Sequence, residues 1–132
     1  RLYGECFKVY APSPEAGTKP SLVQQLVLLI EDHVSDPNAS VKMLAAALHV
    51  NSDYLGRVFK EAMHVPVGQY LVRKRVELAC MRLRESHESI DTIAAQCGFG
   101  SRRQFYDQFQ VLVGKTPGRY RADSAFIETI TL

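Results

Sequence analysis

The chain carries one sequence pattern twice, and this duplication restricts its fold more than any other feature. The first copy spans Leu44–Phe59 and the second spans Ile93–Phe109. The matching positions are Leu44, Ala45, Ala46, Val50, Ser52, Leu55 and Phe59 in the first copy and Ile93, Ala94, Ala95, Phe99, Ser101, Phe105 and Phe109 in the second. Their offset changes from 49 to 50 along the pattern, so one residue is inserted at the turn of the second copy.

Each copy predicts a helix-turn-helix unit. It begins as a short helix rich in alanine, continues through a tight turn, and ends in a helix with two large apolar residues four positions apart. Ala45 and Ala94 are small, which lets two short helices cross closely. Gly98, in the second turn, suits a left-handed backbone conformation that other residues resist.

The segment between the two copies, Val67–Ser86, predicts one long helix. It has no proline, and its only glycine is near the start. At about 100° per residue, its apolar side chains form two opposed stripes, and its charged residues, Arg75 among them, fall on the flanks between them. One stripe holds Val72, Val76, Ala79, Cys80 and Leu83, and the other holds Val67, Tyr70, Leu71, Leu78 and Met81. Because each stripe requires a packing partner, we expect this helix to join the two units.

Serine residues indicate where four other helices begin. We expect Ser21 to cap a helix that runs to about Ser35, and Ser40 to cap one over Val41–Leu48. Ser89 and Ser101 are the corresponding caps in the second unit, and Pro117 is expected to open a last short helix. The predicted inner face of the first helix consists of Leu22, Leu26, Leu29, Ile30 and His33.

The domain limits follow from composition. Residues 12–20 contain three prolines and one glycine, which is typical of a linker. The chain also starts at Arg1 without a methionine, so we expect residues 1–20 to be a linker or the tail of a missing upstream domain. The predicted domain covers residues 21–122, with units at about 40–63 and 89–113 and the linker helix at 67–86. Residues 123–132 are expected to be a tail, whose β-prone end either frays or pairs with a short strand at 1–11.

Composition excludes several classes of protein. With 46% apolar and 23% charged residues the chain is ordinary for a globular domain, and it has no apolar run long enough to cross a membrane. The cysteines, Cys6, Cys80 and Cys97, form no CxxC pair, and the four histidines share no metal-ligand spacing. The region from Arg57 to Arg121 holds twelve Lys or Arg against six acidic residues. This basic excess suits a nucleic-acid binder, although a solvated helix surface also explains it.

The second copy is specific enough to suggest a family. The segment Ser89–Arg121 combines I-x-x-I-A, G-F, two spaced phenylalanines, G-x-T-P and Y-R, and it resembles the AraC/XylS family of bacterial transcription regulators. The first copy agrees more loosely, and the similarity covers about Ser21–Arg121. It implies an all-α DNA-binding domain of seven helices, in which two helix-turn-helix subdomains are joined by a long linker helix. Both recognition helices would enter adjacent major grooves of double-stranded DNA, and the operator would be asymmetric because one chain carries both.

The resemblance also implies which residues meet DNA. Its base-reading positions fall on Asp53, Gly56, Arg57, Arg102, Arg103, Tyr106 and Asp107. Its positions for contact with the DNA backbone fall on Ser52, Lys60, Ser101, Gln110 and Arg121, and packing is the alternative role for Arg121. Arg57 and Arg103 are the best candidates for bidentate recognition of guanine, and the competing interpretation is that they are solvated or contact phosphate.

Several positions depart from the family pattern. Gly56 has no side chain where a polar reader is common, and Gln110 replaces a common lysine. Asp53 and Asp107 present acids toward the groove, and we expect Asp107 to orient Arg103. His64 stands where a helix-ending glycine is usual, so the first unit is expected to leave its second helix through a strained or different turn.

The predicted function is sequence-specific DNA binding in bacterial transcription regulation, in the cytoplasm, with no cofactor, metal or catalytic residue. RNA polymerase is an expected partner, and a small-molecule effector would act only through a missing N-terminal domain. The main alternative is a protein-interaction module with little DNA specificity. An enzyme that uses Cys6 as nucleophile is disfavoured, because the sequence places no histidine partner or helix N-terminus beside it.

Overall fold

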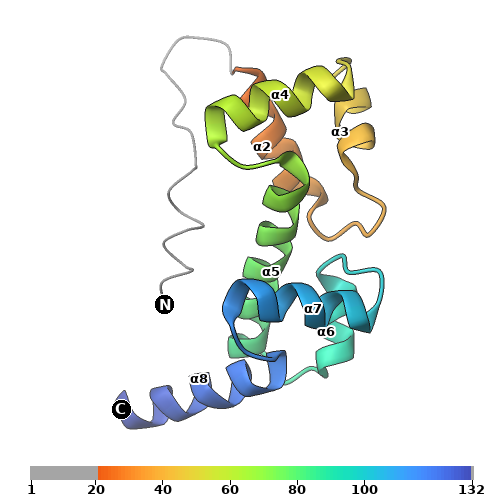
Figure 1. The fold of residues 1–132 in the computed structure, drawn as a ribbon. Helices are drawn as coiled ribbons and strands as arrows, with labels where there is room; N and C mark the ends of the chain where they lie inside the picture. The colour runs from red at the N-terminus through yellow and green to blue at the C-terminus, as the bar shows by residue number, and fades with distance from the viewer. Residues whose placement is uncertain (1–20, 132) are drawn as a thin grey trace.

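The computed structural model describes residues 21–131, which form seven helices and contain no strand. The helices are α2 (Leu22–His33), α3 (Val41–Ala47), α4 (Ser52–Met63), α5 (Val67–Glu85), α6 (Ile90–Gln96), α7 (Arg102–Val113) and α8 (Pro117–Thr131). Helix α5 runs through the middle of the molecule, with α2, α3 and α4 at one end and α6, α7 and α8 at the other (Figure 1). The predicted all-α class and the number of helices are confirmed.

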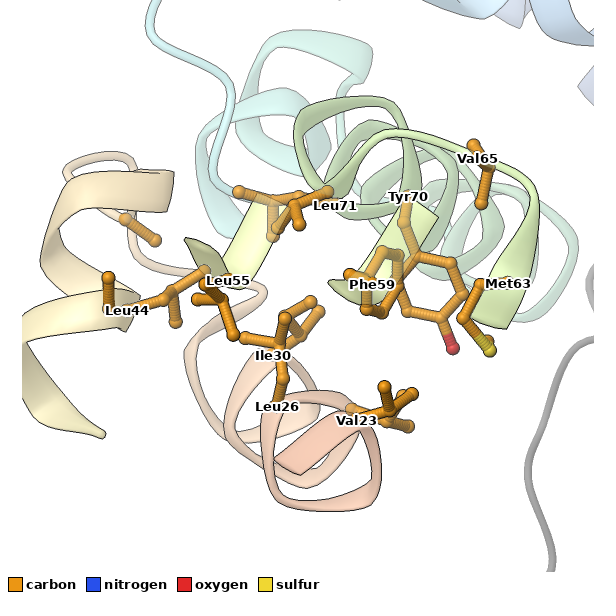
Figure 2. Packing of buried hydrophobic residues seen from close by; sticks show 14 residues of the cluster. Val23, Leu26, Ile30, Leu44, Leu55, Phe59, Met63, Val65, Tyr70 and Leu71 are labelled. Atoms are coloured by element: carbon orange, nitrogen blue, oxygen red, sulfur yellow. The ribbon is translucent and has the colours of Figure 1, made fainter. Parts of the chain in front are cut away.

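The first lobe consists of α2, α3, α4 and the N-terminal part of α5, and one hydrophobic cluster holds it together. Leu26, Ile30 and Phe59 are fully buried in it. The rings of Phe59 and Tyr70 meet edge to face with centroids 5.3 Å apart, which connects α4 to α5 (Figure 2). The predicted anchors of α4, Leu55 and Phe59, are therefore confirmed as core residues.

The second lobe consists of the C-terminal part of α5 with α6, α7 and α8. Its core contains a series of aromatic contacts, in which Phe105 lies 4.9 Å from Phe99 and 5.5 Å from Phe109 between ring centroids. Phe109 in turn contacts Tyr120 of α8 at 5.7 Å. Because Phe99 belongs to the turn between α6 and α7, this series ties the turn, the second helix of the unit and α8 into one core.

Helix α5 divides its apolar residues by position along the helix rather than by stripe, which corrects the prediction. Leu78, expected on the same side as Val67 and Tyr70, packs against the second cluster, and Met81 is 39% exposed. The lobes are stacked along the helix axis, so each lobe covers only half of its length (Figure 1). Arg75, expected on a charged flank, is only 6% exposed and is the one buried charged residue among those described.

The predicted serine caps are confirmed. The side-chain oxygens of Ser21, Ser40, Ser89 and Ser101 accept hydrogen bonds from the backbone amides of Gln24, Met43, Thr92 and Gln104. Helix α4 begins at Ser52, and its cap is the side chain of Asn51. Each cap satisfies amides that the first turn of a helix leaves without an internal partner.

The inner face of α2 is rotated from the predicted one. Its buried residues are Val23, Leu26, Val27 and Ile30, whereas Leu22 and Leu29 are only partly buried. Helix α2 packs against both α3 and α4, so its buried surface is broader than one narrow row of leucines.

The C-terminal segment is helical, which overturns two predictions. Helix α8 is 15 residues long rather than short, and residues 123–131 continue it instead of forming a β-prone tail. After Gly118 the segment contains no glycine or proline, so a helix started at Pro117 meets no breaker, and extending a formed helix is easier than starting another structure. The strand and linker predicted within residues 1–20 lie outside the described residues.

Among residues 21–131, four have a left-handed backbone, and they occupy matching places in the two units. Gly98 (φ +88°) follows α6, and its counterpart after α3 is His49 (φ +60°). Gly114 (φ +86°) ends α7, and its counterpart at the end of α4 is His64 (φ +63°). The expected strained exit at His64 is therefore confirmed, because a residue with a Cβ atom resists this conformation.

None of the described helices has the length and apolar character that crossing a bilayer requires.

Candidate nucleic-acid interface

The first candidate recognition helix is α4, and its orientation follows from its anchors. Because Leu55 and Phe59 point into the core, the opposite face of α4 is turned to solvent. The predicted DNA-contacting residues on that face are exposed at Asp53, Arg57 and Lys60 and half-buried at Ser52 and Gly56. A Cβ atom at Gly56 would meet no other atom within 4 Å, so this position leaves a gap between the neighbouring side chains.

An aromatic side chain, which was not predicted as a site residue, supports Arg57. The guanidinium of Arg57 lies 5.8 Å from the ring centroid of Tyr54, within the range of a cation–π contact, and Tyr54 is 47% exposed. The sequence contains the signal for this contact, since a tyrosine three positions before an arginine shares its helix face. Tyr54 therefore adds an exposed ring to the outer face of α4.

The second candidate recognition helix is α7, where Arg102 is held by two partners. Arg102 Nη1 donates to Asp91 Oδ2 of α6 at 3.1 Å, and Arg102 Nη2 donates to the Tyr106 hydroxyl at 3.3 Å. Its guanidinium also lies 5.0 Å from the Tyr106 ring centroid. Asp91 was not predicted as a site residue, because it becomes a neighbour of Arg102 only when α6 and α7 pack together.

Arg103 is the more exposed candidate on α7. Its side chain is 92% exposed, and Arg103 Nε lies 3.9 Å from Asp107 Oδ2, one helical turn further on. This long ion pair agrees with the expectation that Asp107 orients Arg103. Exposed pairs of this kind contribute little to stability, so a DNA base could replace the carboxylate at small cost. Gln110 is exposed on the same helix.

The two helix N-termini offer backbone amides to an anion. The Asn51 side chain accepts from the amides of Asp53 and Tyr54, and the amide of Ser52 lies outside that pair. At α7, Ser101 is the exposed N-cap, and its side chain accepts from the Gln104 amide at 3.1 Å. Amides at such ends carry partial positive charge and bind phosphate oxygens.

Arg121 is engaged inside the second lobe. Its Nε donates to the Leu83 carbonyl at 3.1 Å and its Nη2 donates to the Ser86 carbonyl at 3.2 Å. These carbonyls end α5, where the last turn of a helix lacks internal donors. The geometry favours packing, the alternative predicted for Arg121, over contact with the DNA backbone.

Acidic neighbours neutralise part of the basic excess counted in the sequence. Asp123 accepts from Lys115 at 2.8 Å and from Arg119 at 3.3 Å, and the hydrogen bond from Lys115 is the main cause that lowers the pKa of Asp123. Lys74 likewise pairs with Glu77 at 2.9 Å. On α7, Arg102 and Arg103 also face acidic side chains, Asp91 and Asp107, whereas Arg57 and Lys60 are exposed cations on α4. Within residues 21–131, no group of three His, Cys, Asp or Glu residues could hold a metal ion.

The fold and the two exposed helices define a class of protein, the helix-turn-helix DNA-binding domain of transcription regulators. A family model described as "Helix-turn-helix domain" matches residues 44–123, which spans most of the first unit and all of the second. The chain belongs to the AraC/XylS family of bacterial transcription regulators, and it is not an enzyme.

Named relatives agree with this family. The chain is 32% identical over 124 residues to the uncharacterized transcriptional regulatory protein YesN of Bacillus subtilis, covering 92% of this chain but only 34% of YesN. It is 29% identical over 100 residues to the regulatory protein SoxS of Escherichia coli, covering 76% of this chain and 92% of SoxS. The chain therefore spans about a third of the first relative and nearly all of the second.

Solved structures show the same arrangement of helices. The C-terminal domain of the two-component response regulator yesN from Fusobacterium nucleatum is 30% identical, with a TM-score of 0.71 over 73% of this chain and 93% of that domain. The DNA-binding domain of the global transcriptional factor AdpA, solved in complex with a target DNA, is 27% identical, with a TM-score of 0.73 over 80% of this chain and 93% of that one. DNA binding in transcription regulation is accordingly the function of this domain class.

Proposed function

We propose that this domain reads an asymmetric DNA site by placing α4 and α7 in two adjacent major grooves. The observation that supports the proposal is the position of these helices on two lobes that share α5 (Figure 1). Each helix also carries exposed arginines, Arg57 on α4 and Arg102 and Arg103 on α7. The 19 residues of α5 span about 28 Å at 1.5 Å per residue. That length is close to the repeat of the major groove, which is about 34 Å.

The proposed base-reading surface comprises Asp53, Gly56, Arg57, Arg102, Arg103, Tyr106 and Asp107. Arg57 and Arg103 are the residues to which we assign bidentate contact with guanine, because both side chains are exposed and have only weak intramolecular partners. Arg102 is held by Asp91 and Tyr106, so its direction is set before DNA arrives. Each well-placed arginine pair would discriminate against a wrong base by about 1 to 3 kcal/mol.

The proposed phosphate contacts come from Lys60 and Gln110 and from the backbone amides at Ser52 and Ser101. Such contacts position the protein on the duplex but read no sequence. We assign Arg121 a structural role instead, on the basis of its two carbonyl contacts.

The wider regulatory role is proposed from the family. We infer that the domain acts in the bacterial cytoplasm and contacts RNA polymerase, and that an effector, where one is used, binds a separate domain upstream of residue 21. The AdpA domain solved with its target DNA supports the DNA partner only.

The test of base reading is selection of bound sequences from a random duplex library at fixed salt, with wild type, Arg57→Ala and Arg103→Ala. We expect wild type to enrich one asymmetric site with two read patches about one helical turn apart. Each substitution should relax specificity in its own patch only. Lys42→Ala, which removes an exposed cation outside the proposed surface, serves as the control and should leave both patches unchanged.

A protein-interaction module is the competing function, and Val111 on α7, which is 79% exposed, is the observation that favours it. Salt dependence separates the two functions. Release of counterions makes DNA affinity fall steeply with salt, whereas an apolar protein contact is nearly insensitive to it. If the library yields no enriched sequence and weak binding disappears with salt, this domain does not read DNA alone and the proposal is wrong.

A further inference from the structure

The boundary between the two lobes contains a buried arginine that the proposed interface does not use. Arg75 lies on α5 between Leu71, which belongs to the first hydrophobic cluster, and Val76, which belongs to the second. It is only 6% exposed. A buried guanidinium is costly unless its donors are satisfied, so its partners indicate what it does.

Both partners are backbone carbonyls at the end of α2. Arg75 Nε donates to the Val34 carbonyl at 3.1 Å, and Arg75 Nη2 donates to the Asp36 carbonyl at 2.7 Å. Val34 is the C-cap of α2, so its carbonyl oxygen lies where a helix leaves carbonyls without internal donors and carries partial negative charge. Asp36 lies two residues further on, and its carbonyl also accepts from the backbone amide of Ala39 at 3.1 Å. Charge-assisted bonds of this length are among the stronger ones in proteins. Arg75 thus ties the middle of α5 to the far end of α2.

The turn of the second unit reaches the same point. An ideal Cβ atom on Gly98 would lie 2.5 Å from the Val34 carbonyl oxygen, 2.9 Å from Arg75 Nε and 3.2 Å from the Ser35 carbonyl carbon. Real Cβ atoms essentially never come within 3.0 Å of a neighbouring heavy atom of this kind, so only glycine permits this approach. The first lobe, α5 and the second lobe therefore meet at one place, through Val34, Arg75 and Gly98.

We propose that this junction is an inter-lobe clasp that fixes the distance and rotation between α4 and α7, and so selects the spacing between the two halves of the DNA site. The hydrophobic clusters of the two lobes share no residue, and α5 contributes to both. A single connecting helix still allows the two lobes to bend and twist relative to each other, and a second contact beside that helix restricts both motions. Arg75 and Gly98 are positioning residues that touch no base. The selection of DNA-site spacing rests on the proposed function. The restraint that the clasp places on the two lobes does not depend on it.

Two matched pairs of variants test the clasp without DNA. Arg75→Met removes both bonds from α5 to the segment after α2 at the junction, and its control Arg121→Met removes two similar guanidinium–carbonyl bonds that lie within the second lobe. Gly98→Ala and Gly114→Ala carry the same left-handed strain, with φ of +88° and +86°, but a Cβ atom at Gly114 would meet nothing within 4 Å. The difference within each pair isolates the inter-lobe contact from stability and strain.

The readout is the relative orientation of the lobes, measured from residual dipolar couplings in NMR spectra. We expect one alignment tensor to fit both lobes in wild type, Arg121→Met and Gly114→Ala, and separate tensors to be required for Arg75→Met and Gly98→Ala. If Arg75→Met does not fold, Arg75→Lys, which keeps the charge and can reach only one carbonyl, takes its place. A single wild-type tensor in both the Arg75 and the Gly98 variants would overturn the clasp.

The second readout is affinity for duplexes in which the two halves of the selected site are moved by one base pair. One base pair changes separation by about 3.4 Å and rotation by about 34°. We expect wild type and Gly114→Ala to lose about tenfold in affinity, and Arg75→Met to lose less than about threefold. If the wild-type protein binds every spacing equally well, the proposal that α4 and α7 read two adjacent grooves is wrong. The NMR result then still tests whether the clasp restrains the lobes. If wild type is selective and Arg75→Met is equally selective, spacing control by the clasp is wrong.

Discussion

Arginine side chains in this domain differ in role according to the groups that hold them. Arg103 is 92% exposed with one carboxylate at 3.9 Å, whereas Arg75 is 6% exposed and bonded to two carbonyls. A base can draw Arg103 from its partner at small cost, but removing the Arg75 side chain would break two part-buried, charge-assisted hydrogen bonds. The same residue type therefore supplies recognition at one position and architecture at another.

His49 is predicted to lower stability because it holds a left-handed backbone at φ +60°, where its counterpart is Gly98. His49 is exposed, so its side chain contributes little packing in return. We expect His49→Gly to raise the free energy of unfolding by about 0.5 to 1 kcal/mol, because glycine adopts this conformation without steric cost. Urea denaturation with an unchanged m-value is the measurement.

The control for that prediction is His49→Ala, which keeps a Cβ atom in the same conformation and should bring no gain. Equal stabilisation by alanine and glycine would show that the imidazole, and not the backbone, is unfavourable at this position.

Burial of Cys97 predicts a pH dependence of stability. Burial raises the pKa of the Cys97 thiol from 9.0 to about 11 in the folded protein. Between these two pKa values the Cys97 thiol is ionised in the unfolded chain but still protonated in the folded protein. The folded protein is therefore at its most stable, as far as this thiol is concerned, below pH 9, and it loses stability as the pH rises toward 11. We expect titration of this thiol to lower the free energy of unfolding by about 1 kcal/mol between pH 8 and pH 10.

The measurement is urea unfolding of wild type and Cys97→Ala at both pH values. Alanine lowers stability at each pH through the cavity it leaves, but it should remove this part of the pH dependence. The same loss from pH 8 to pH 10 in both proteins would contradict the assignment.

At the scale of elements, the two helix-turn-helix units repeat one design with different residues. Helices α4 and α7 both begin with a side-chain cap, both bury two large residues four apart, and both end in a left-handed residue. The caps differ, as do the residues at the left-handed ends. These local differences leave the outward faces of α4 and α7 in equivalent positions, because the anchors on the inner face set the direction of each helix.

Lys60 and Arg121 are both candidate contacts to the DNA backbone in the sequence analysis. We predict that substituting them has different effects. Lys60 is exposed on α4, so Lys60→Met should reduce the slope of log affinity against log salt by about 1. Arg121 caps the end of α5, so Arg121→Met should lower the free energy of unfolding by about 1.5 to 3 kcal/mol and leave that slope unchanged.

Binding titrations at several salt concentrations and denaturation curves of both variants provide the test. A reduced salt slope in Arg121→Met would return Arg121 to the list of phosphate contacts.

At the scale of the whole molecule, two separate hydrophobic clusters share one long helix. Residues up to Leu71 serve the first cluster and residues from Val76 onward serve the second. Each cluster is small, so each lobe depends on α5 being folded, while local opening of one lobe need not open the other core.

Phe59→Ala is therefore predicted to loosen one lobe selectively. Phe59 is fully buried in the first cluster, and its truncation should cost about 3 to 5 kcal/mol. Hydrogen exchange followed by mass spectrometry should show faster exchange in α2, α3 and α4 and near wild-type protection in α6 and α7. Phe109→Ala is the reciprocal control, and equal acceleration in both lobes for either variant would show a single cooperative unit.

The limits of prediction are clearest in α5 and α8. The stripes of α5 include all of its buried apolar residues, but they also include the exposed Met81 and omit the buried Arg75. The pattern does not indicate that two lobes divide the helix along its length, so it placed Leu78 with the wrong lobe. For α8, the isoleucines and threonines near the end suggest a strand, yet the helix continues from Pro117 because nothing in the sequence breaks it. The local strand propensity of a few residues is weak in comparison with the tendency of a formed helix to extend.

The sequence by itself determined the repeat, the serine caps, the anchors of α4 and α7, the glycine turns and the family, because each depends on residues close together in the chain. Only the tertiary structure decided the roles of Asp91, Arg121 and Arg75. Those roles depend on neighbours brought in by packing, such as the carbonyls of Val34 and Asp36, which lie about forty positions from Arg75 in the chain. A carbonyl at a helix end has no side-chain signature, so no pattern of residue types could have indicated the partner of a buried arginine.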